Sequence, residues 1–495
     1  MADAYLNYIG GTWVPSASGA TFANINPARP SDVIGEFQRS NAADVDRAVT
    51  AAAKAFSDWR RMPAPRRGEV IARATRLLEE RKPELAAGIT REMGKVMVDS
   101  GYDVQGAITS GNYMAGEGRR MFGDTVPSEL PNRIAFTRRE PVGVVGIVTP
   151  WNLPMLMPAW KLFPALICGN TAVVKPAEDT PMTAVSLFEI LEEAGLPPGV
   201  ANLVTGFGSE AGQPLVEHPD VDMISFTGSR KVGKAIGRSA GEALKHVSLE
   251  MGGKNALIVL EDADLDEAIT GALWGGFSTT GQRCTASSRL VVDQLVADEV
   301  VEGLVARIGN LTVGDGQEPD TDVGPLINQT QLQRVHGYTE IGREEGATLV
   351  VGGERLGDQL GGGFFYSPTL FDHATPDMRI AQEEIFGPTI TVLRVNGDEE
   401  AIQVANGTRY GLSAAIYTRD TARALRAVTE LEAGIVYLNA PTIGSEIHLP
   451  FGGIKDTGNG HRESGRAAID QFSETKTVFL DYSGQLQRAH IDTSD

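Results

Sequence analysis

Cysteine is scarce in this sequence, with only Cys168 and Cys284 among 495 residues. Two cysteines cannot form the disulfide framework of a small secreted domain, and no CxxC or Cys/His spacing suggests a metal site. The N-terminal residues lack the basic segment and the apolar run of a secretory signal. We therefore expect no metal and a reducing, cytoplasmic location.

Long uninterrupted hydrophobic runs and an excess of positive charge are also missing. The most apolar stretch, residues 142–168, is broken by prolines and contains Asn152 and Lys161, which would be costly in lipid. It is better read as a buried strand, a loop and a helix that opens with proline. With 44 basic and 64 acidic residues the formal net charge is −20, so the surface on average repels nucleic acid and anionic membranes. We expect neither as a partner.

The composition that remains is that of a large soluble globular protein. Apolar residues make up 42% and charged residues 22% of the chain. The length favours two or three domains. Residues 1–40 read as a polar, turn-rich segment that leads into helices.

Two sets of short apolar runs alternate with helical patterns after residue 142. Such alternation is typical of parallel sheets that are covered by helices on both faces. We therefore predict two doubly wound α/β domains. The first set comprises residues 144–148, 171–174, 201–204, 221–226 and 247–249, and the second comprises residues 256–260, 290–292, 389–395 and 434–438.

Two further strand-like segments, residues 133–139 and 475–482, have no obvious partner inside either domain. Exposed strand edges tend to be paired or covered. We therefore expect these segments to pair between subunits of a homo-oligomer.

Three residues could carry covalent chemistry. Cys284 lies among small and polar residues, where it is either a nucleophile or a structural thiol. Glu250 ends a predicted strand and could act as a base towards a thiol or a water. Asn152 also follows a strand, and its amide could either stabilise an oxyanion or satisfy backbone groups. These residues alone leave both interpretations open.

A phosphate site could form where the strand at residues 221–226 runs into Gly228, Ser229 and Gly233 and then into a helix. The backbone N–H groups at such a helix start attract phosphate. The glycine spacing is not that of the GxGxxG motif, so a plain turn remains the alternative. Lys175 and Glu178 follow another strand at its carboxyl end, where they could bind ribose hydroxyls or remain solvated.

Seven motifs, in order along nearly the whole chain, resemble those of the aldehyde dehydrogenase superfamily. They are PWNLP at 150–154, GNTAVVKPAE at 169–178, FTGS at 226–229, LEMGGK at 249–254, GQRC at 281–284, EEIFGP at 383–388 and PFGG at 450–453. Met251 stands where leucine is commoner in the family, which does not affect the site.

The resemblance implies NAD(P)-dependent oxidation of an aldehyde to its acid through a thioester on Cys284. In that role Glu250 activates the deacylating water, and Asn152 with the backbone N–H of Cys284 holds the oxyanion. Lys161 and Glu463 match a pair that would relay the proton of the base. Cys168 matches no catalytic position and is expected to be a buried structural thiol.

The resemblance also implies where the cofactor and the substrate bind. NAD is expected because a carboxylate at the ribose disfavours a 2′-phosphate, although Lys175 nearby keeps NADP as the alternative. The implied cofactor residues are Thr149, Trp151, Lys175, Glu178, Phe226, Gly228, Ser229, Gly233, Glu384 and Phe386. The implied residues of the aldehyde tunnel are Leu153, Met157, Trp160, Arg283, Thr285 and Phe451, with the loop 443–449 at its mouth.

The substrate and the exact activity have several readings. The sequence of residues 444–453 is similar to that of family branches that oxidise semialdehydes, including 2-oxoglutarate and aminoadipate semialdehydes. Arg283 either pairs with a substrate carboxylate or points away and holds its loop. A broad-specificity enzyme and a CoA-acylating semialdehyde dehydrogenase are alternatives, and an inactive protein that reuses the fold is a remote one. Glu250 argues against CoA acylation, because that branch does not usually keep the base.

The resemblance finally implies a domain division and an assembly. Residues 1–120 and 142–252 would form the cofactor domain, and residues 253–454 the catalytic domain. Residues 121–141 and 472–495 would be oligomerisation strands. A homodimer or homotetramer is expected.

Overall fold

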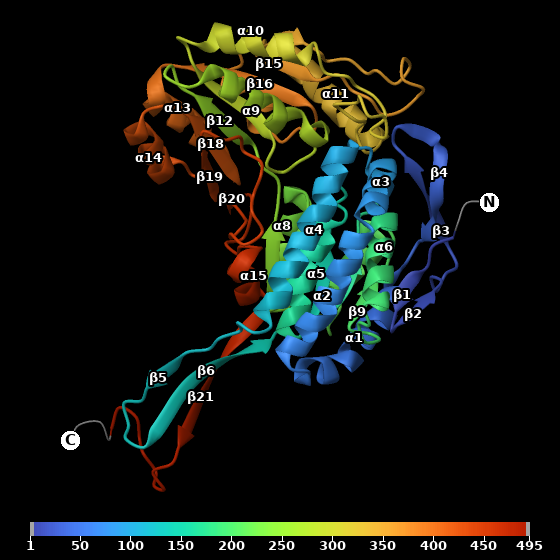
Figure 1. The fold of residues 1–495 in the computed structure, drawn as a ribbon, viewed down its shortest axis with the longest axis vertical. Helices are drawn as coiled ribbons and strands as arrows, with labels where there is room; N and C mark the ends of the chain where they lie inside the picture. The colour runs from blue at the N-terminus through green and yellow to red at the C-terminus, as the bar shows by residue number, and fades with distance from the viewer. Residues whose placement is uncertain (1–3, 492–495) are drawn as a thin grey trace.

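Two large sheets, each covered by helices, form the body of the protein, and a thin three-stranded sheet extends away from it (Figure 1). The computed structural model describes residues 4–491. The mixed α/β class predicted from the alternating pattern is confirmed.

The first sheet has seven strands, of which the five central to the prediction run parallel. Their residues are almost all buried, because helices cover both faces. In spatial order the strands are β11 (His246–Glu250), β10 (Met223–Thr227), β7 (Val144–Val148), β8 (Thr171–Lys175), β9 (Ala201–Leu203), β1 (Asn7–Ile9) and β2 (Thr12–Val14). The accompanying helices are α1 (Ala42–Arg61), α6 (Pro181–Glu193), α7 (Gln213–Glu217, after a π-turn at Gly208–Gly212) and α8 (Arg230–Glu242), while α2 (Ala64–Glu80) and α3 (Lys82–Met93) pack mainly on other helices.

The N-terminal segment is more ordered than its turn-rich sequence suggested. Strands β1 and β2 add to the first sheet in antiparallel orientation, and β3 (Thr21–Asn26) forms a hairpin with β4 (Arg29–Gln38). Only three residues form each of β1 and β2, which is too short for an alternating pattern to be recognised.

The second sheet also has seven strands, and all but one are parallel to their neighbours. In spatial order they are β14 (Thr348–Val351), β15 (Thr369–Asp372), β16 (Thr389–Val395), β13 (Ser287–Asp293), β12 (Asn255–Val259), β18 (Ser413–Tyr417) and β19 (Ile435–Leu438). The accompanying helices are α9 (Leu265–Phe277), α10 (Ala297–Ile308), α11 (Gln329–Glu344), α12 (Arg379–Gln382), α13 (Gly397–Asn406) and α14 (Thr421–Glu430). A short ladder joins β17 (Tyr410–Gly411) to β20 (Ile454–Lys455).

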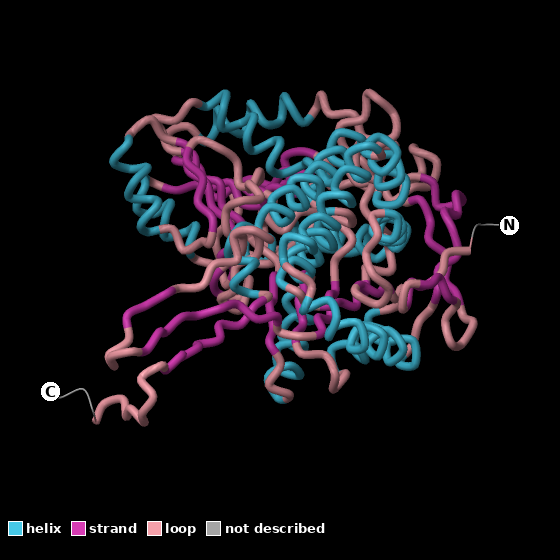
Figure 2. Tube along the Cα trace, turned by 60° about the horizontal axis from the view of Figure 1, so that its bottom comes forward, coloured by secondary structure: helices cyan, strands magenta, loops and turns pink. Residues whose placement is uncertain are grey.

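Helices α4 (Met97–Glu117) and α5 (Leu156–Cys168) run side by side through the centre of the body (Figures 1 and 2). Every residue of α5 is buried, so the apolar stretch at residues 142–168 is the strand, loop and buried helix that its prolines indicated. Within residues 4–491, no helix combines the length and apolar character needed to cross a bilayer.

The thin sheet consists of β5 (Thr125–Pro127), β6 (Arg133–Pro141) and β21 (Ser473–Asp481), with α15 (Gly465–Gln471) leading into it. The two loose segments lie outside both large sheets, and each has a partner strand within the chain, while pairing between subunits stays a prediction. Strands β6 and β21 pair with each other along nine residues, in antiparallel orientation. Because the two strands are more than 300 residues apart in the sequence, their pairing could not be recognised from the sequence alone. Residues 492–495 of the predicted oligomerisation segment, and residues 1–3 of the predicted cofactor domain, lie outside the described part of the chain.

Candidate active site

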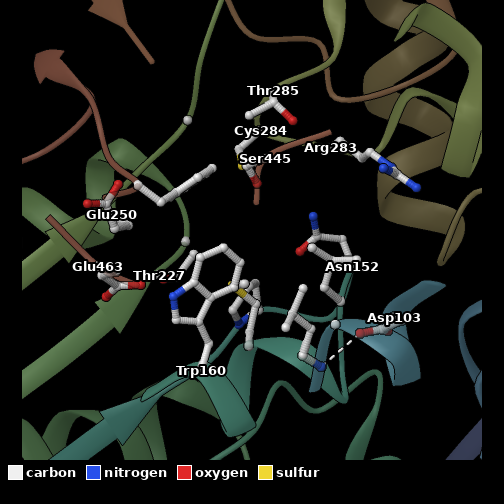
Figure 3. Close-up of a pocket in the computed structure, with 18 of the residues that line it drawn as sticks. Asp103, Asn152, Trp160, Thr227, Glu250, Arg283, Cys284, Thr285, Ser445 and Glu463 are labelled. Atoms are coloured by element: carbon white, nitrogen blue, oxygen red, sulfur yellow. Dashed lines mark hydrogen bonds between the residues drawn. The ribbon is translucent and has the colours of Figure 1, made fainter. Parts of the chain in front are cut away.

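A cavity of about 710 Å³ lies where the loops of the two sheets meet helices α4 and α5. It brings together most of the residues expected from the sequence (Figure 3). Among them are Asn152, Glu250, Cys284 and Glu463, then Trp151, Gly228, Ser229, Glu384 and Phe386, and all six tunnel residues, Leu153, Met157, Trp160, Arg283, Thr285 and Phe451. Thr149, Lys161, Lys175, Glu178, Phe226 and Gly233 do not line it.

Cys284 is partly exposed to this cavity, and its position depends on an unusual turn. Just before it, Thr279 and Thr280 have φ angles of 54° and 58°, which β-branched residues rarely adopt. The backbone oxygen of Cys284 accepts a hydrogen bond from Asn255 Nδ2 at 2.8 Å. Burial, with Glu384 and Glu250 nearby, raises the pKa of the Cys284 thiol to about 12. The thiol therefore needs a proton acceptor before it can act as a nucleophile.

Cys168 differs from Cys284 because it lies in a closed apolar setting. Its side chain is buried in α5, and its sulfur lies 3.8 Å from the backbone oxygen of Ile469. Burial raises the pKa of this thiol to about 12 as well. Cys168 lines none of the cavity described above, which agrees with the structural role expected for it.

Asn152 is physically joined to the segment that carries the cysteine. Its Nδ2 donates a hydrogen bond to the backbone oxygen of Gln282 at 3.0 Å. The side chain is buried and faces the same part of the cavity as Cys284 (Figure 3). An amide N–H in this place can stabilise negative charge that develops next to the sulfur.

Glu250 ends strand β11 with its carboxylate in the cavity. Within residues 4–491, neither carboxylate oxygen has a hydrogen-bond donor in range. Burial, and then the neighbouring carboxylate of Glu463, raises the pKa of Glu250 well above its usual value. A Cβ on Gly452, whose φ is 145°, would lie 2.5 Å from Glu250 Oε1, so this position requires glycine. A buried carboxylate without bound donors is suited to accept a proton.

Lys161 lies behind the cavity wall and contacts Glu463. Its Nζ donates to Glu463 Oε1 and to Ser225 Oγ, the latter at 3.2 Å, and the Lys161 side chain is fully buried. Glu463 lies next to Glu250 in Figure 3. The lysine thus contacts Glu463, and its positive charge also opposes the rise in the pKa of Glu250.

The far side of the cavity has the features of a nucleotide-ring site. Trp151 and Phe386 meet edge to face, with ring centroids 5.3 Å apart. Glu384 accepts a hydrogen bond from the backbone N–H of Gly253 at 3.1 Å. Ser229 caps α8, where its hydroxyl accepts from the backbone N–H of Val232 at 3.4 Å. This cap satisfies one N–H group at the start of a 13-residue helix, and helix starts of this kind attract anions.

Of the remaining expected cofactor residues, two form an ion pair and the others are packed inside the fold. Lys175 Nζ and Glu178 Oε2 form an ion pair 3.2 Å apart at the carboxyl end of β8. Burial lowers the pKa of Lys175, which Glu178 partly offsets. Phe226 and Gly233 instead serve packing, since a Cβ on Gly233 would lie 2.4 Å from the sulfur of Met251 and 3.4 Å from the Phe226 ring. Thr149 is buried at the end of β7.

Arg283 lines the cavity, but its guanidinium binds residues of the protein itself. Its Nε donates to Thr279 Oγ1 at 2.9 Å, and its Nη2 donates to Asp99 Oδ1 at 3.3 Å. Its nitrogen atoms point away from Cys284 (Figure 3). These contacts favour the interpretation in which Arg283 holds its own loop. Trp160 and Phe451 form an aromatic wall nearby, with centroids 5.2 Å apart.

One wall of the cavity was not predicted from the sequence. Helix α4 presents Tyr102, Gln105, Gly106 and Thr109 to it. Their spacing of three and four residues is a helical face, which could have been recognised as a polar stripe. The stripe resembles an ordinary solvated helix face, so its place in a cavity could not be predicted.

Comparisons with known proteins agree with this site. The model of the "Aldehyde dehydrogenase family" matches residues 13–478. Alpha-ketoglutaric semialdehyde dehydrogenase of Bacillus subtilis is 44% identical over 97% of this chain and 98% of its own. The corresponding enzyme of Haloferax volcanii is 43% identical over 97% of this chain and 100% of its own. Human retinaldehyde dehydrogenase 3 is also 43% identical, over 96% of this chain and 92% of its own.

A solved structure extends the comparison to three dimensions. The NAD+ complex of an aldehyde dehydrogenase from Bacillus cereus is 40% identical, with a TM-score of 0.94 over 97% of both chains. The match of sequence, fold and motif order over almost the full length is decisive. The chain belongs to the aldehyde dehydrogenase family.

Proposed function

We propose that this protein oxidises an aldehyde to its carboxylic acid with NAD, through a thioester on Cys284. The observation that carries the proposal is the convergence of Cys284, Asn152 and Glu250 on one cavity that also contains Glu384 and Phe386. A nucleophile, an oxyanion donor and a base are the three functions that this reaction needs from the protein.

Each of the three residues has a defined role in the proposed reaction. The sulfur of Cys284 attacks the aldehyde carbon, and the resulting oxyanion is held by Asn152 Nδ2 and the backbone N–H of Cys284. The tetrahedral carbon must then lose a hydride, for which bound NAD would supply the acceptor. Glu250 then takes a proton from water, which attacks the thioester and releases the acid. The Cys284 thiolate that leaves takes a proton, which regenerates the thiol and completes the cycle.

The raised pKa of the Cys284 thiol means that it needs a base, and the raised pKa of Glu250 makes that carboxylate a stronger proton acceptor. A thiol whose pKa is about 12 is protonated at neutral pH. Glu250 has a raised pKa and no bound donor, so it can accept protons from both thiol and water. We propose that Glu463 and Lys161 pass these protons away from Glu250.

The cofactor assignment rests on residues that fit an adenine dinucleotide. We propose that Lys175 and Glu178 bind the adenosine ribose, that the turn at Gly228 and Ser229 binds the diphosphate, and that Glu384 binds the nicotinamide ribose. Trp151 and Phe386 would flank the ring, while Thr149, Phe226 and Gly233 shape the fold around it. The Glu178 carboxylate favours NAD over NADP. The relative from Bacillus cereus binds NAD+.

For the substrate we propose a semialdehyde with a carboxylate at its far end, such as 2-oxoglutarate semialdehyde. Two of the relatives carry that activity in their names, whereas a third of similar identity is a retinaldehyde dehydrogenase. Tyr102, Gln105, Ser445 and His448 line the cavity and supply polar groups for such a substrate. Leu153, Met157, Trp160, Thr285 and Phe451 would surround its aliphatic part. We assign Arg283 to its loop.

We further propose a homo-oligomer, a dimer or a tetramer, that works in the cytoplasm. The arm formed by β5, β6 and β21 leaves the body and exposes Ile134, Phe479 and Leu480. Exposed apolar residues on such an arm, with Phe479 and Leu480 on its edge strand β21, favour association with another subunit. Two free thiols suit a reducing compartment. The body would divide into cofactor and catalytic domains at residue 252.

The test is a spectrophotometric screen of semialdehydes and uncharged aldehydes with NAD and NADP, with product analysis in the presence and absence of CoA. We expect NADH formation, the highest kcat/KM for a dicarboxylic semialdehyde, and free acid as product with or without CoA. Accumulation of acyl-CoA would overturn the hydrolytic mechanism in favour of the CoA-acylating alternative. Absence of NADH and NADPH formation from the whole panel would overturn the proposed activity.

A further inference from the structure

Two buried aspartates on one turn of helix α4 face the two segments that carry the catalytic groups. Asp99 and Asp103 are four residues apart, on the same side of the helix, and both are almost completely buried. We propose that they form, with Lys95, a positioning device that sets Asn152 against Cys284. The proposal rests on the proposed function and adds three positioning residues to it.

The first half of the device holds the segment of Asn152. Lys95 Nζ and Asp103 Oδ2 form an ion pair 2.7 Å apart with no solvent exposure of either side chain. The same Nζ donates to the backbone oxygen of Asn152 at 3.0 Å. Asp103 Oδ1 accepts from the backbone N–H of Leu156 at 2.8 Å. Asp103 lies on the side of the cavity that carries Asn152 (Figure 3). The pair thus fixes both ends of residues 152–156.

The second half holds the turn that leads to Cys284. Asp99 accepts hydrogen bonds from the backbone N–H of Thr279 at 2.6 Å and from its hydroxyl at 3.0 Å. It also accepts from Ser278 Oγ at 2.9 Å and from Arg283 Nη2 at 3.3 Å. The left-handed backbone of Thr279 and Thr280 is unfavourable for β-branched residues, so it persists only where neighbours hold it. The hydrogen bonds that Asp99 accepts from Thr279 stabilise this backbone conformation.

The two halves meet at one hydrogen bond, from Asn152 Nδ2 to the backbone oxygen of Gln282, 3.0 Å long. Gln282 itself is fixed, because its Oε1 accepts from the backbone N–H of Ile327 at 3.0 Å. Lys95 and Asp99 do not line the cavity, and the carboxylate of Asp103 is engaged by Lys95 and Leu156. These residues therefore act through Asn152 and the cysteine loop. Since a misplacement of ~1 Å can cost on the order of 10²-fold in rate, a rigid common support has a catalytic effect.

The test is a double-mutant cycle of Asp103→Asn and Asn152→Ala, measured by single-turnover NADH formation with dicarboxylic semialdehyde. In the native background we expect Asp103→Asn to lower the rate of NADH formation by about 10- to 100-fold with an unchanged Kd for NAD. In the Asn152→Ala background the same change should cost less than about threefold, because the group that it positions is gone. A merely structural role would give the same factor in both backgrounds.

Asp44→Asn is the matched control. Asp44 is also a fully buried carboxylate with a basic partner, Arg47, and it accepts from the backbone N–H of Asn41 in the capping box of α1 without lining the cavity. We expect it to change thermal stability but not the rate of NADH formation. Equal rates of Asp103→Asn and Asp44→Asn, or equal factors in both arms of the cycle, would overturn the proposal. Its failure would leave the proposed function intact provided that Asn152→Ala alone is impaired.

Two further variants keep the test decisive if Asp103→Asn does not fold. The double change Lys95→Met and Asp103→Leu removes the whole ion pair, so no charge is left buried without a partner. Asp99→Asn acts on the other half, where the basic partner Arg283 is partly exposed. We expect each to lower the rate of NADH formation by at least tenfold in folded enzyme. Native rates in both would overturn the proposal.

Discussion

The two ends of the cavity are built differently. At the reacting end, Asn152, Glu250 and Glu463 are each at most 5% exposed, and buried hydrogen bonds hold the loops that carry them. At the mouth, Tyr102 is 60% and Trp274 44% exposed, and Glu446 and His448 form only an exposed contact of 3.5 Å. Exposed polar contacts contribute little to stability, whereas buried ones fix geometry. In the proposed reaction the chemistry would therefore depend on rigid parts of the cavity, and the choice of aldehyde on parts that can change without affecting it.

Removing the nucleophile should have the largest effect of any change at the reacting end of the cavity. We expect Cys284→Ser to lower turnover by at least ~10⁴-fold, because the thioester cannot form. NAD binding should survive, since the proposed cofactor contacts lie elsewhere, and titration of the variant with NAD measures it. Cys168→Ala is the control and should retain turnover, because that thiol is buried in α5 outside the cavity. Near-normal turnover of Cys284→Ser would refute the covalent mechanism.

Substitution of Arg283 tests whether this side chain belongs to the rigid, reacting end of the cavity or to the part that selects the substrate. If it holds the loop of Cys284, Arg283→Gln should lower kcat by about tenfold for a dicarboxylic semialdehyde and for an uncharged aldehyde of equal length alike. The measurement is kcat and KM for both substrates. A loss confined to the charged substrate would instead assign the guanidinium to a substrate carboxylate.

The smallest effect is expected at the mouth, where His448 provides the contrast to Arg283. His448→Gln should raise KM for the charged substrate by less than about tenfold and leave kcat unchanged, because an exposed ionic contact contributes at most about 1 kcal/mol. The uncharged aldehyde should show no change in KM. A fall in kcat for both substrates would mean that the mouth is coupled to the chemistry.

Most of the reacting end could be predicted because its residues follow predicted strands. Glu250 ends β11, and Asn152 follows β7 in a loop, so the sheet pattern and the motifs placed them correctly in one cavity. The direction of the Arg283 side chain could not be predicted, because it depends on two left-handed threonines. Lys95, Asp99 and Asp103 were also not predicted, since charged residues in a loop or on a helix resemble solvated groups until tertiary packing buries them.

The fold shows the same limit. The parallel strands were recognisable as apolar runs, whereas the pairing of β6 with β21 joins segments that are far apart in sequence. The short strands β1 and β2 carry no pattern of their own and owe their conformation to the edge of the first sheet. Tertiary context decided these elements.

The most direct test of the account is to trap the thioester. Glu250→Gln should slow both proton transfers, but at alkaline pH the thiol of Cys284 can also lose its proton to bulk solvent. Mixing this variant at alkaline pH with NAD and a dicarboxylic semialdehyde should therefore give a burst of about one NADH per active site, because hydrolysis of the thioester still lacks its base. Intact mass spectrometry should then show one added acyl group, and peptide mapping should place it on Cys284. A burst of NADH without any adduct, or an adduct on another residue, would contradict the mechanism.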